Sequence, residues 1–359
     1  MCVGGEGHDH IIPHRYDRVA RTPLTANHTY PSRRSMMTVV TCLSPYTVDQ
    51  VKTLVGTAEI EVRLVPDPPA PTAVRQAVVG ADVIIGDVRA KHRLDRDTLA
   101  AVGSCRLIQQ PAVGYDSIDV TAAAEFGIPV ANAGGYNAET VADWVVMAAL
   151  NLLRNGARRD ASMHAGAYDR SFERSHELSA MTVGIVGLGN IGRAVAHRLA
   201  GFGSTVLGHD PVVAQPVPGV RQVSLDDLLA GSTIITIHAP LTEVTRHLIN
   251  PATIDLLRPD AMIINASRGP LIDEVALIDA LRTGRIGGAA LDVYEAEPLA
   301  TDSALRTFDN VFLTPHIAGD SLESRRRLQE LVADNLRRVL LHGEPPHHVV
   351  NAALPATAN

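Results

Sequence analysis

Short apolar runs alternate with helix-like segments along most of the chain. From residue 38, the runs TVVTCL, EIEVRLV, DVIIG and RLIQQ are rich in β-branched residues, and segments such as VDQVKTLVG and PTAVRQAVVG separate them. Strand-like runs that alternate with helical patterns are typical of βαβ units in a parallel sheet. The pattern therefore predicts a first α/β unit over residues 38–136.

A second series of the same kind follows the apolar segment ETVADWVVMAALNLLRNGARRDASMHAG. This segment predicts one long helix that joins two domains, forms a subunit interface or lies in a core, with Trp144 serving packing. The runs TVGIV, STVLGHD, TIITIHAP, AMIINAS and GGAALDV complete a doubly wound pattern over residues 137–319. The last helix, in ESRRRLQELVADNLRRVLLHG, needs a partner sheet, so we expect residues 320–351 to cross back and complete the first unit.

The composition adds limits on partners and location. The 359 residues are 46% hydrophobic and 20% charged, with a net charge of -7 and no dense Lys/Arg block, which argues against a nucleic-acid or membrane partner. Cys2, Cys42 and Cys105 form no CxxC pair, so neither a disulfide framework nor a thiolate metal site is indicated. Because no apolar run reaches the ~18 residues of a membrane span, we expect a cytoplasmic protein.

The N-terminal segment has a different character from the rest of the chain. Residues 1–37 are polar and lack a sustained helical or strand period, which predicts a disordered tail. His8, His10 and His14 lie in it without a carboxylate or thiolate framework to fix their geometry. We therefore interpret them as solvated side chains and predict no metal site.

The segment GLGNIG at residues 187–192 matches the glycine pattern of a dinucleotide site between a strand and a helix. Gly187 would allow the tight turn, Gly189 would let the backbone approach a pyrophosphate, and Gly192 would permit close packing of the helix. Asp210 follows the next strand, where a carboxylate accepts hydrogen bonds from ribose hydroxyls and repels a 2′-phosphate. This favours NAD(H) over NADP(H), although the nearby Arg221 leaves the phosphorylated cofactor as an alternative.

Charged residues follow three later strand-like runs. Arg268 lies in NASRG, Asp292 and Glu297 lie in LDVYEAEP, and His316 lies in LTPHIAG. A hydride transfer to a carbonyl needs a proton donor, and histidine titrates in the required range. A neighbouring carboxylate fixes the imidazole tautomer, and an arginine binds a substrate carboxylate. These residue types together predict an oxidoreductase acting on a small anionic molecule.

These motifs are similar to those of the D-isomer-specific 2-hydroxyacid dehydrogenase family over roughly residues 38–351. The segments AVGYDSIDVTAAAEFGIPVANAGG, VGLGNIGRAVAHRL, HAPLT, NASRGPLIDEVAL, AALDVYEAEPL and DNVFLTPHIAG occur in the family's order. The resemblance implies two Rossmann-like domains with parallel sheets. A flavodoxin-like substrate domain (38–136 with 320–351) and an NAD-binding Rossmann domain (137–319) would enclose an interdomain active site.

The resemblance also implies roles for individual residues. Arg268 would bind substrate, Glu297 would tune His316, and His316 would donate the proton during reduction of a 2-oxo acid. Asp292 would hydrogen-bond the nicotinamide carboxamide. The backbone N–H groups of Val113 and Gly114 would hold the substrate carboxylate, and the remaining cofactor positions would be Asn190, Ile191, Asp210, Ala266 and Gly319, besides the motif glycines.

Several alternatives remain. YNAETVAD resembles the NAD-dependent formate dehydrogenase branch, with Asn137 at its formate-contacting position, but that branch has glutamine where this chain has Glu297. An NAD(H)-sensing binding protein, as in the corepressor branch, is a third candidate. The family is commonly dimeric, so a homodimer is expected, and the identity of the 2-hydroxy acid stays open.

Two features near the predicted substrate loop bear on substrate size and charge. Ala112 stands where the family often has glycine, and its methyl group would narrow the approach of the substrate. The cluster Arg89, Lys91, His92 and Arg93 is interpreted as a solvated loop rather than a site for a second anionic group.

Overall fold

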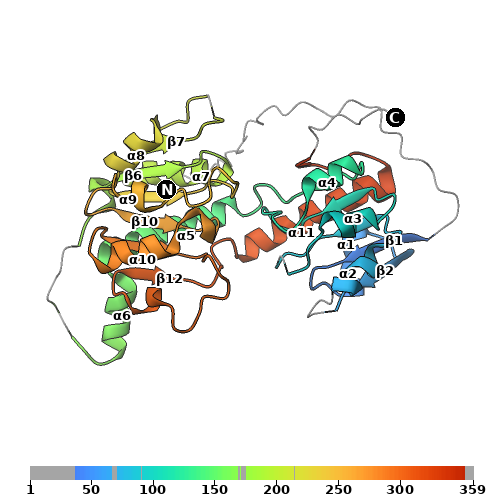
Figure 1. Ribbon diagram of the computed structural model, residues 1–359, viewed down its shortest axis with the longest axis horizontal. Helices are drawn as coiled ribbons and strands as arrows, with labels where there is room; N and C mark the ends of the chain where they lie inside the picture. The colour runs from blue at the N-terminus through green and yellow to red at the C-terminus, as the bar shows by residue number, and fades with distance from the viewer. Residues whose placement is uncertain are drawn as a thin grey trace, which may run out of the picture.

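The computed structural model describes residues 37–66, 71–89, 91–168, 170, 175–213 and 215–351. The predicted tail, apart from Met37, and its three histidines lie outside these ranges. Figure 1 shows two lobes, each built around one sheet, joined by the segment between β5 and α5 and by the segment leading into α11. The predicted α/β fold with two parallel sheets is confirmed.

The first sheet has five parallel strands in the order β2-β1-β3-β4-β5. Their bounds are β1 Thr38–Cys42, β2 Ile60–Leu64, β3 Val83–Ile85, β4 Leu107–Gln109 and β5 Val130–Ala131. Successive residues of β1 point to opposite faces, so Val39 and Val40 belong to separate hydrophobic cores. The helices of this lobe are α1 Val48–Val55, α2 Pro71–Val78, α3 Arg96–Ala100, α4 Val120–Glu125 and the returning α11 Leu322–Arg337.

Helix α11 supplies apolar side chains to the first lobe although it follows the whole second series in the chain. Its Val332 and Leu336 are fully buried in the core that also contains Val40 and Val55. The apolar stripe of this helix thus finds a partner in the first sheet. The expected boundary at residue 136 falls in the segment between β5 and α5.

The second sheet has seven parallel strands in the order β12-β11-β10-β9-β6-β7-β8. The strands are β6 Thr182–Val186, β7 Thr205–His209, β8 Arg221–Gln222, β9 Ile234–Ile237, β10 Met262–Asn265, β11 Gly288–Leu291 and β12 Val311–Leu313. The order reverses at β6, and the crevice beside such a reversal is the usual ligand site of an open α/β sheet. The helices are α5 Ala138–Arg154, α6 Gly156–His164, α7 Asn190–Phe202, α8 Leu225–Gly231, α9 Pro251–Ile254 and α10 Glu274–Arg282.

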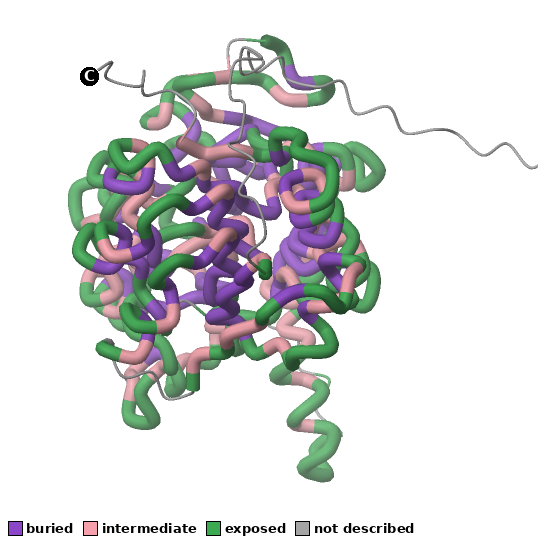
Figure 2. Tube along the Cα trace, turned by 90° about the vertical axis from the view of Figure 1, so that its right-hand side faces the viewer, coloured by how far each residue is buried: buried purple, intermediate pink, exposed green. Residues whose placement is uncertain are grey.

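The predicted single helix over residues 139–166 is wrong, because the structure divides it into α5 and α6. Asn155 adopts the left-handed conformation (φ 52°), and its N–H donates to Asn151 O at the end of α5. Asparagine tolerates this conformation better than most residues, so it ends the helix. Trp144 lies in the core and stacks on Phe312 at 6.2 Å, whereas α6 has no buried residue and projects from the lobe (Figure 2).

Within the described ranges, none of the helices combines the length and apolarity that crossing a membrane requires. The same residues contain no group of three or more histidine, cysteine, aspartate or glutamate side chains placed to hold a metal ion.

Candidate active site

A large cleft lies between the carboxyl ends of the two sheets. Every site residue predicted from the sequence lines it except Gly192, which is buried in α7. The first lobe contributes the segments after β3, β4 and β5, and the second contributes the loops after β6, β7, β9, β10, β11 and β12. The site therefore depends on residues from both lobes.

The glycine motif has the backbone geometry that a dinucleotide site requires. Gly187 has φ +96°, and a Cβ there would lie 2.7 Å from the carbonyl of His238. A Cβ on Gly192 would overlap Gly187 O, so the glycine allows α7 to approach β6. Gly189 has no atom within 4 Å of the corresponding position, and α7 begins at the next residue, Asn190. The open space before a helix N-terminus fits a pyrophosphate.

Asp210 lies beyond β7 with its carboxylate fixed by the backbone. Its Oδ2 accepts the N–H of Leu188 at 2.8 Å, and its Oδ1 accepts the N–H groups of Val212 and Val213 at 2.9 and 3.1 Å. An ionised carboxylate has about four acceptor positions, so capacity remains for a ribose hydroxyl. The bond to Leu188 ties Asp210 to the glycine turn between β6 and α7.

His316 and Glu297 form an ion pair at the surface of the cleft. His316 Nδ1 donates to Glu297 Oε2 at 2.7 Å, and the two side chains are 51% and 37% exposed. This hydrogen bond raises the pKa of His316 against the opposing effect of desolvation. Burial by itself would raise the pKa of Glu297, but the hydrogen bond and the charge of His316 lower it overall. The pair therefore favours an imidazolium whose Nε2–H is free of Glu297.

Asp292 holds the backbone that carries His316. Its Oδ1 accepts the N–H of Ile317 and its Oδ2 accepts that of Ala318, both at 2.8 Å, and the hydroxyl of Thr314 also donates to Oδ1. Asp292 is 1% exposed, and its own carbonyl accepts the N–H of His316. These bonds support the left-handed conformation of His316 (φ 57°).

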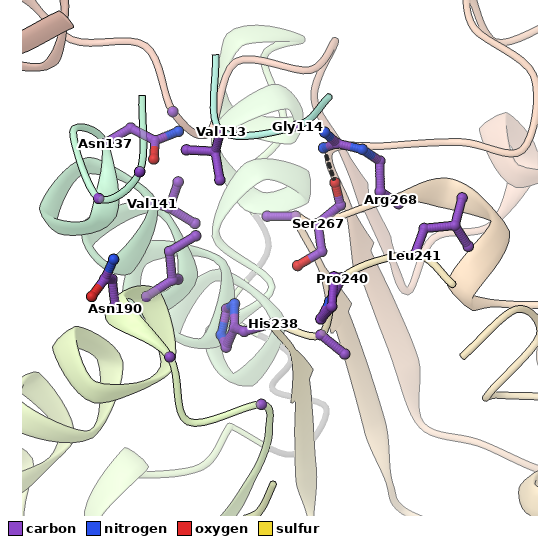
Figure 3. Close-up of a pocket in the computed structure, with 18 of the residues that line it drawn as sticks. Val113, Gly114, Asn137, Val141, Asn190, His238, Pro240, Leu241, Ser267 and Arg268 are labelled. Carbon is purple, nitrogen blue, oxygen red and sulfur yellow. Dashed lines mark hydrogen bonds between the residues drawn. The ribbon is translucent and has the colours of Figure 1, made fainter. Parts of the chain in front are cut away.

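Arg268 reaches from the end of β10 toward the first lobe (Figure 3). Its Nη1 donates to Ser267 O at 2.7 Å, and its Nε donates to Asp116 Oδ2 at 3.0 Å. The next residue, Gly269, passes so close to the Tyr294 backbone that a Cβ would overlap the Tyr294 carbonyl. The glycine thus allows the turn that directs Arg268 into the cleft.

The loop after β4 faces Arg268 from the first lobe. Asn132 Nδ2 donates to Val113 O at 2.7 Å, which fixes this loop, and a Cβ on Gly114 would overlap Arg268 Nη2. Asn137 lies at the start of α5, and no described residue hydrogen-bonds its buried Oδ1. The remaining predicted positions, Ile191, Ala266 and Gly319, also line the cleft.

Comparisons with known proteins show which family this chain belongs to. Residues 146–318 match the model described as D-isomer specific 2-hydroxyacid dehydrogenase, NAD binding domain. A glyoxylate reductase of Thermofilum pendens is 39% identical over 267 residues, which are 72% of this chain and 78% of the relative. The chain belongs to the D-isomer specific 2-hydroxyacid dehydrogenase family. Its second lobe is accordingly the NAD-binding domain.

Two further relatives show how this family member compares in length and shape. A D-3-phosphoglycerate dehydrogenase of Mycobacterium leprae is 39% identical over 79% of this chain, but the chain spans only 53% of that relative. The structure of an NAD-dependent formate dehydrogenase from Staphylococcus aureus, solved with NAD, has a TM-score of 0.75 and 30% identity, and the match covers 85% of this chain and 96% of that one. Both similarities extend over the two lobes.

Sequence reasoning missed His238, which the dehydrogenase family motif HAPLT places at the end of β9. Its Nε2 lies 2.9 Å from Thr236 Oγ1, while no described residue hydrogen-bonds its buried Nδ1. Burial lowers the pKa of His238 to about 3, so the ring is neutral at physiological pH. Its position directly after a strand was the available signal.

The interpretation of residues 89–93 as a solvated loop is wrong for His92. This side chain is fully buried, and its Nδ1 donates to the equally buried Asp87 at 2.7 Å. Asp87 also accepts the backbone N–H groups of Arg89, Lys91 and His92. The hydrogen bonds of this loop therefore converge on a buried carboxylate. The charged residue types of the segment did not predict this burial.

Proposed function

We propose that this protein is an NAD(H)-dependent 2-oxoacid reductase that also runs in reverse as a D-2-hydroxyacid dehydrogenase. The observation that carries the proposal is the His316–Glu297 pair in the same cleft as Arg268. Such a pair supplies a proton donor, and the guanidinium supplies a binding group for a carboxylate. We assign residues 137–319 to the cofactor domain, and residues 38–136 with 320–351 to the substrate domain.

In this mechanism the protein's own groups bind the substrate and transfer the proton. Arg268 and the backbone N–H groups of Val113 and Gly114 bind the substrate carboxylate from opposite sides of the cleft. His316 donates its Nε2 proton to the carbonyl oxygen, and Glu297 stabilises the imidazolium before that step. Asp292 keeps the His316 backbone in place.

The glycine motif, Asn190, Ile191, Asp210, Ala266 and Gly319 would hold the cofactor, with Asp292 beside its nicotinamide. When bound there, NADH would supply the hydride for reduction of the carbonyl carbon. The open space beside Gly189 fits the pyrophosphate of NAD(H), and the free acceptor positions of Asp210 fit its ribose hydroxyls. The carboxylate of Asp210 favours NADH over NADPH because a 2′-phosphate would be repelled.

Formate oxidation is the second candidate, supported by Asn137 and by the similarity to a formate dehydrogenase. Release of CO2 from formate needs no proton shuttle, so the His316–Glu297 ion pair favours the hydroxyacid reaction. An NAD(H)-sensing protein would bind NADH without turning over oxo acids.

We also propose a homodimer. The exposed apolar side chains Met147 on α5 and Met163 on the projecting α6 support it, since they offer apolar surface to a second copy. Light scattering coupled to size-exclusion chromatography tests this assembly, because a monomeric mass at micromolar concentration would refute it. A cytoplasmic location remains a prediction.

The first test follows NADH consumption with glyoxylate, hydroxypyruvate, pyruvate and bulkier 2-oxo acids. We expect reduction of at least one of them and a loss of about 10²- to 10⁴-fold in kcat for His316→Ala. His342→Ala is the matched control because His342 is exposed and lies outside the cleft. NAD with formate is assayed separately.

Turnover of formate instead of oxo acids would replace the proposal with the second candidate. Tight NADH binding without any turnover would favour the sensor.

A further inference from the structure

Arg268 and Asp116 pair across the cleft. Asp116 follows Gly114 in the loop after β4, in the five-stranded lobe, whereas Arg268 follows β10 in the seven-stranded lobe. The distance from Arg268 Nε to Asp116 Oδ2 is 3.0 Å, and the two side chains are 32% and 48% exposed. The ion pair therefore ties the predicted substrate-binding arginine to the opposite lobe.

The contacts of the guanidinium divide its donors into two groups. Nε–H binds Asp116 and one Nη1–H binds Ser267 O, while Nη2 makes no hydrogen bond within the described part of the chain. Nη2 is also the atom that a Cβ on Gly114 would overlap. Asp116 and Ser267 thus hold two of the three guanidinium nitrogens, and the third, Nη2, lies against Gly114.

This orientation matters because a guanidinium binds a carboxylate best through two parallel N–H bonds in one plane. With Nε held by Asp116, Nη2 lies against the loop that carries the backbone N–H groups of Val113 and Gly114. A carboxylate bound beside Nη2 at this loop would receive donors from both lobes. Without Asp116, the long arginine side chain would sample other rotamers and lose this alignment.

We propose that Asp116 is a positioning residue that aims the Nη edge of Arg268 at the substrate carboxylate. This inference rests on the proposed function, because it assumes that Arg268 binds an anionic substrate. Asp116 itself does not touch the reacting atoms. It acts by setting the direction of the guanidinium and the spacing of the two lobes at the substrate's position.

The test compares Asp116→Ala, Asp116→Asn and Gly114→Ala in the full-length protein. Steady-state NADH consumption gives kcat and KM for glyoxylate, and quenching of NADH fluorescence gives the Kd of oxalate for the NADH-bound protein. Glu59→Ala is the matched control, since Glu59 is an exposed carboxylate of the same lobe outside the cleft. Unchanged melting temperatures establish that the variants fold.

For Asp116→Ala we expect KM and the oxalate Kd to rise about tenfold. This value is at the lower end of the effects expected from loss of a charge-assisted hydrogen bond, because both groups are partly exposed. The kcat should stay within about twofold, because the proton donor is not altered. Asp116→Asn keeps an acceptor oxygen and should lie between wild type and Asp116→Ala. Gly114→Ala should weaken binding too, because its methyl group displaces Nη2.

Either of two results for Asp116→Ala would overturn the proposal: an unchanged or lower KM and oxalate Kd, or a fall in kcat alone. If wild type reduces no 2-oxo acid, the proposed function fails, but the oxalate titration still tests the role of Asp116. If wild type also fails to bind oxalate, the role of Asp116 is refuted as well.

Discussion

Replacing Glu297 with glutamine tests the proton chemistry directly. The substitution keeps the shape of the side chain but removes the charge that stabilises the His316 imidazolium. In the wild-type protein the 2.7 Å hydrogen bond to Glu297 raises the pKa of His316. The variant should therefore have a His316 pKa below the wild-type value.

The size of the effect follows from the exposure of the pair. Hydrogen bonds to charged groups contribute ~1.5–3 kcal/mol, and exposure of His316 and Glu297 at 51% and 37% favours the lower end. A loss of ~1.5 kcal/mol corresponds to a fall in kcat/KM of roughly tenfold. This loss should be smaller than that caused by His316→Ala, which removes the proton donor itself.

The sign of the pH dependence follows from the direction of the reaction. Reduction needs protonated His316, so kcat/KM should fall as pH rises through the pKa of His316. In Glu297→Gln this fall should begin at a lower pH. For oxidation of a 2-hydroxy acid the neutral ring is needed, so the rate should rise with pH and should do so at a lower pH in the variant.

The assay records kcat/KM for NADH and the best 2-oxo acid across the pH range in which the protein stays folded. Glu295→Gln is the matched control, because Glu295 is two residues away and its carboxylate lies 2.6 Å from His247 Nε2 instead. Superimposable pH profiles for wild type and Glu297→Gln would refute the role assigned to this carboxylate.

Three further predictions concern stability and the cofactor. Asp292→Ala leaves two backbone N–H groups of the His316 loop without acceptors, so urea unfolding should show a loss of ~2–4 kcal/mol. An unaltered unfolding midpoint would contradict this. Gly269→Ala places a methyl group on the Tyr294 carbonyl, and circular dichroism should show a lower melting temperature together with lost activity. Asp210→Ala should raise the Kd of NADH by about tenfold and reduce discrimination against NADPH, measured by fluorescence titration; equal affinities in variant and wild type would argue against this role.

Much of the architecture could be predicted because the strands are marked by compact apolar runs. The runs TVVTCL and AMIINAS became β1 and β10, and GLGNIG occupies the turn from β6 to α7. In contrast, β5 and β8 contain two residues each and show no period that a pattern could reveal. Their pairing is set by neighbouring strands rather than by their own residues.

The site was less predictable where its geometry depends on contacts between distant segments. Arg268 was recognised by its place after a strand, but its partner Asp116 lies 152 positions away in the other lobe. The left-handed conformation of His316 likewise follows from Asp292, and nothing in the segment LTPHIAG reveals it. Residue type therefore indicated the chemistry, while tertiary contacts decided its geometry.

Asp292 and Glu297 are close in the chain, yet their surroundings give them different tasks. Asp292 is buried and accepts two backbone N–H groups, so its contribution to the His316 loop is geometric. Glu297 is partly exposed and accepts a hydrogen bond from His316, whose protonation changes with pH, so its contribution varies with pH. It follows that Asp292→Ala should lower stability and activity at every pH, whereas Glu297→Gln should move the pH profile and lower the free energy of unfolding by less than Asp292→Ala does. Similar pH profiles and similar stability losses in the two variants would show that this division of roles is wrong.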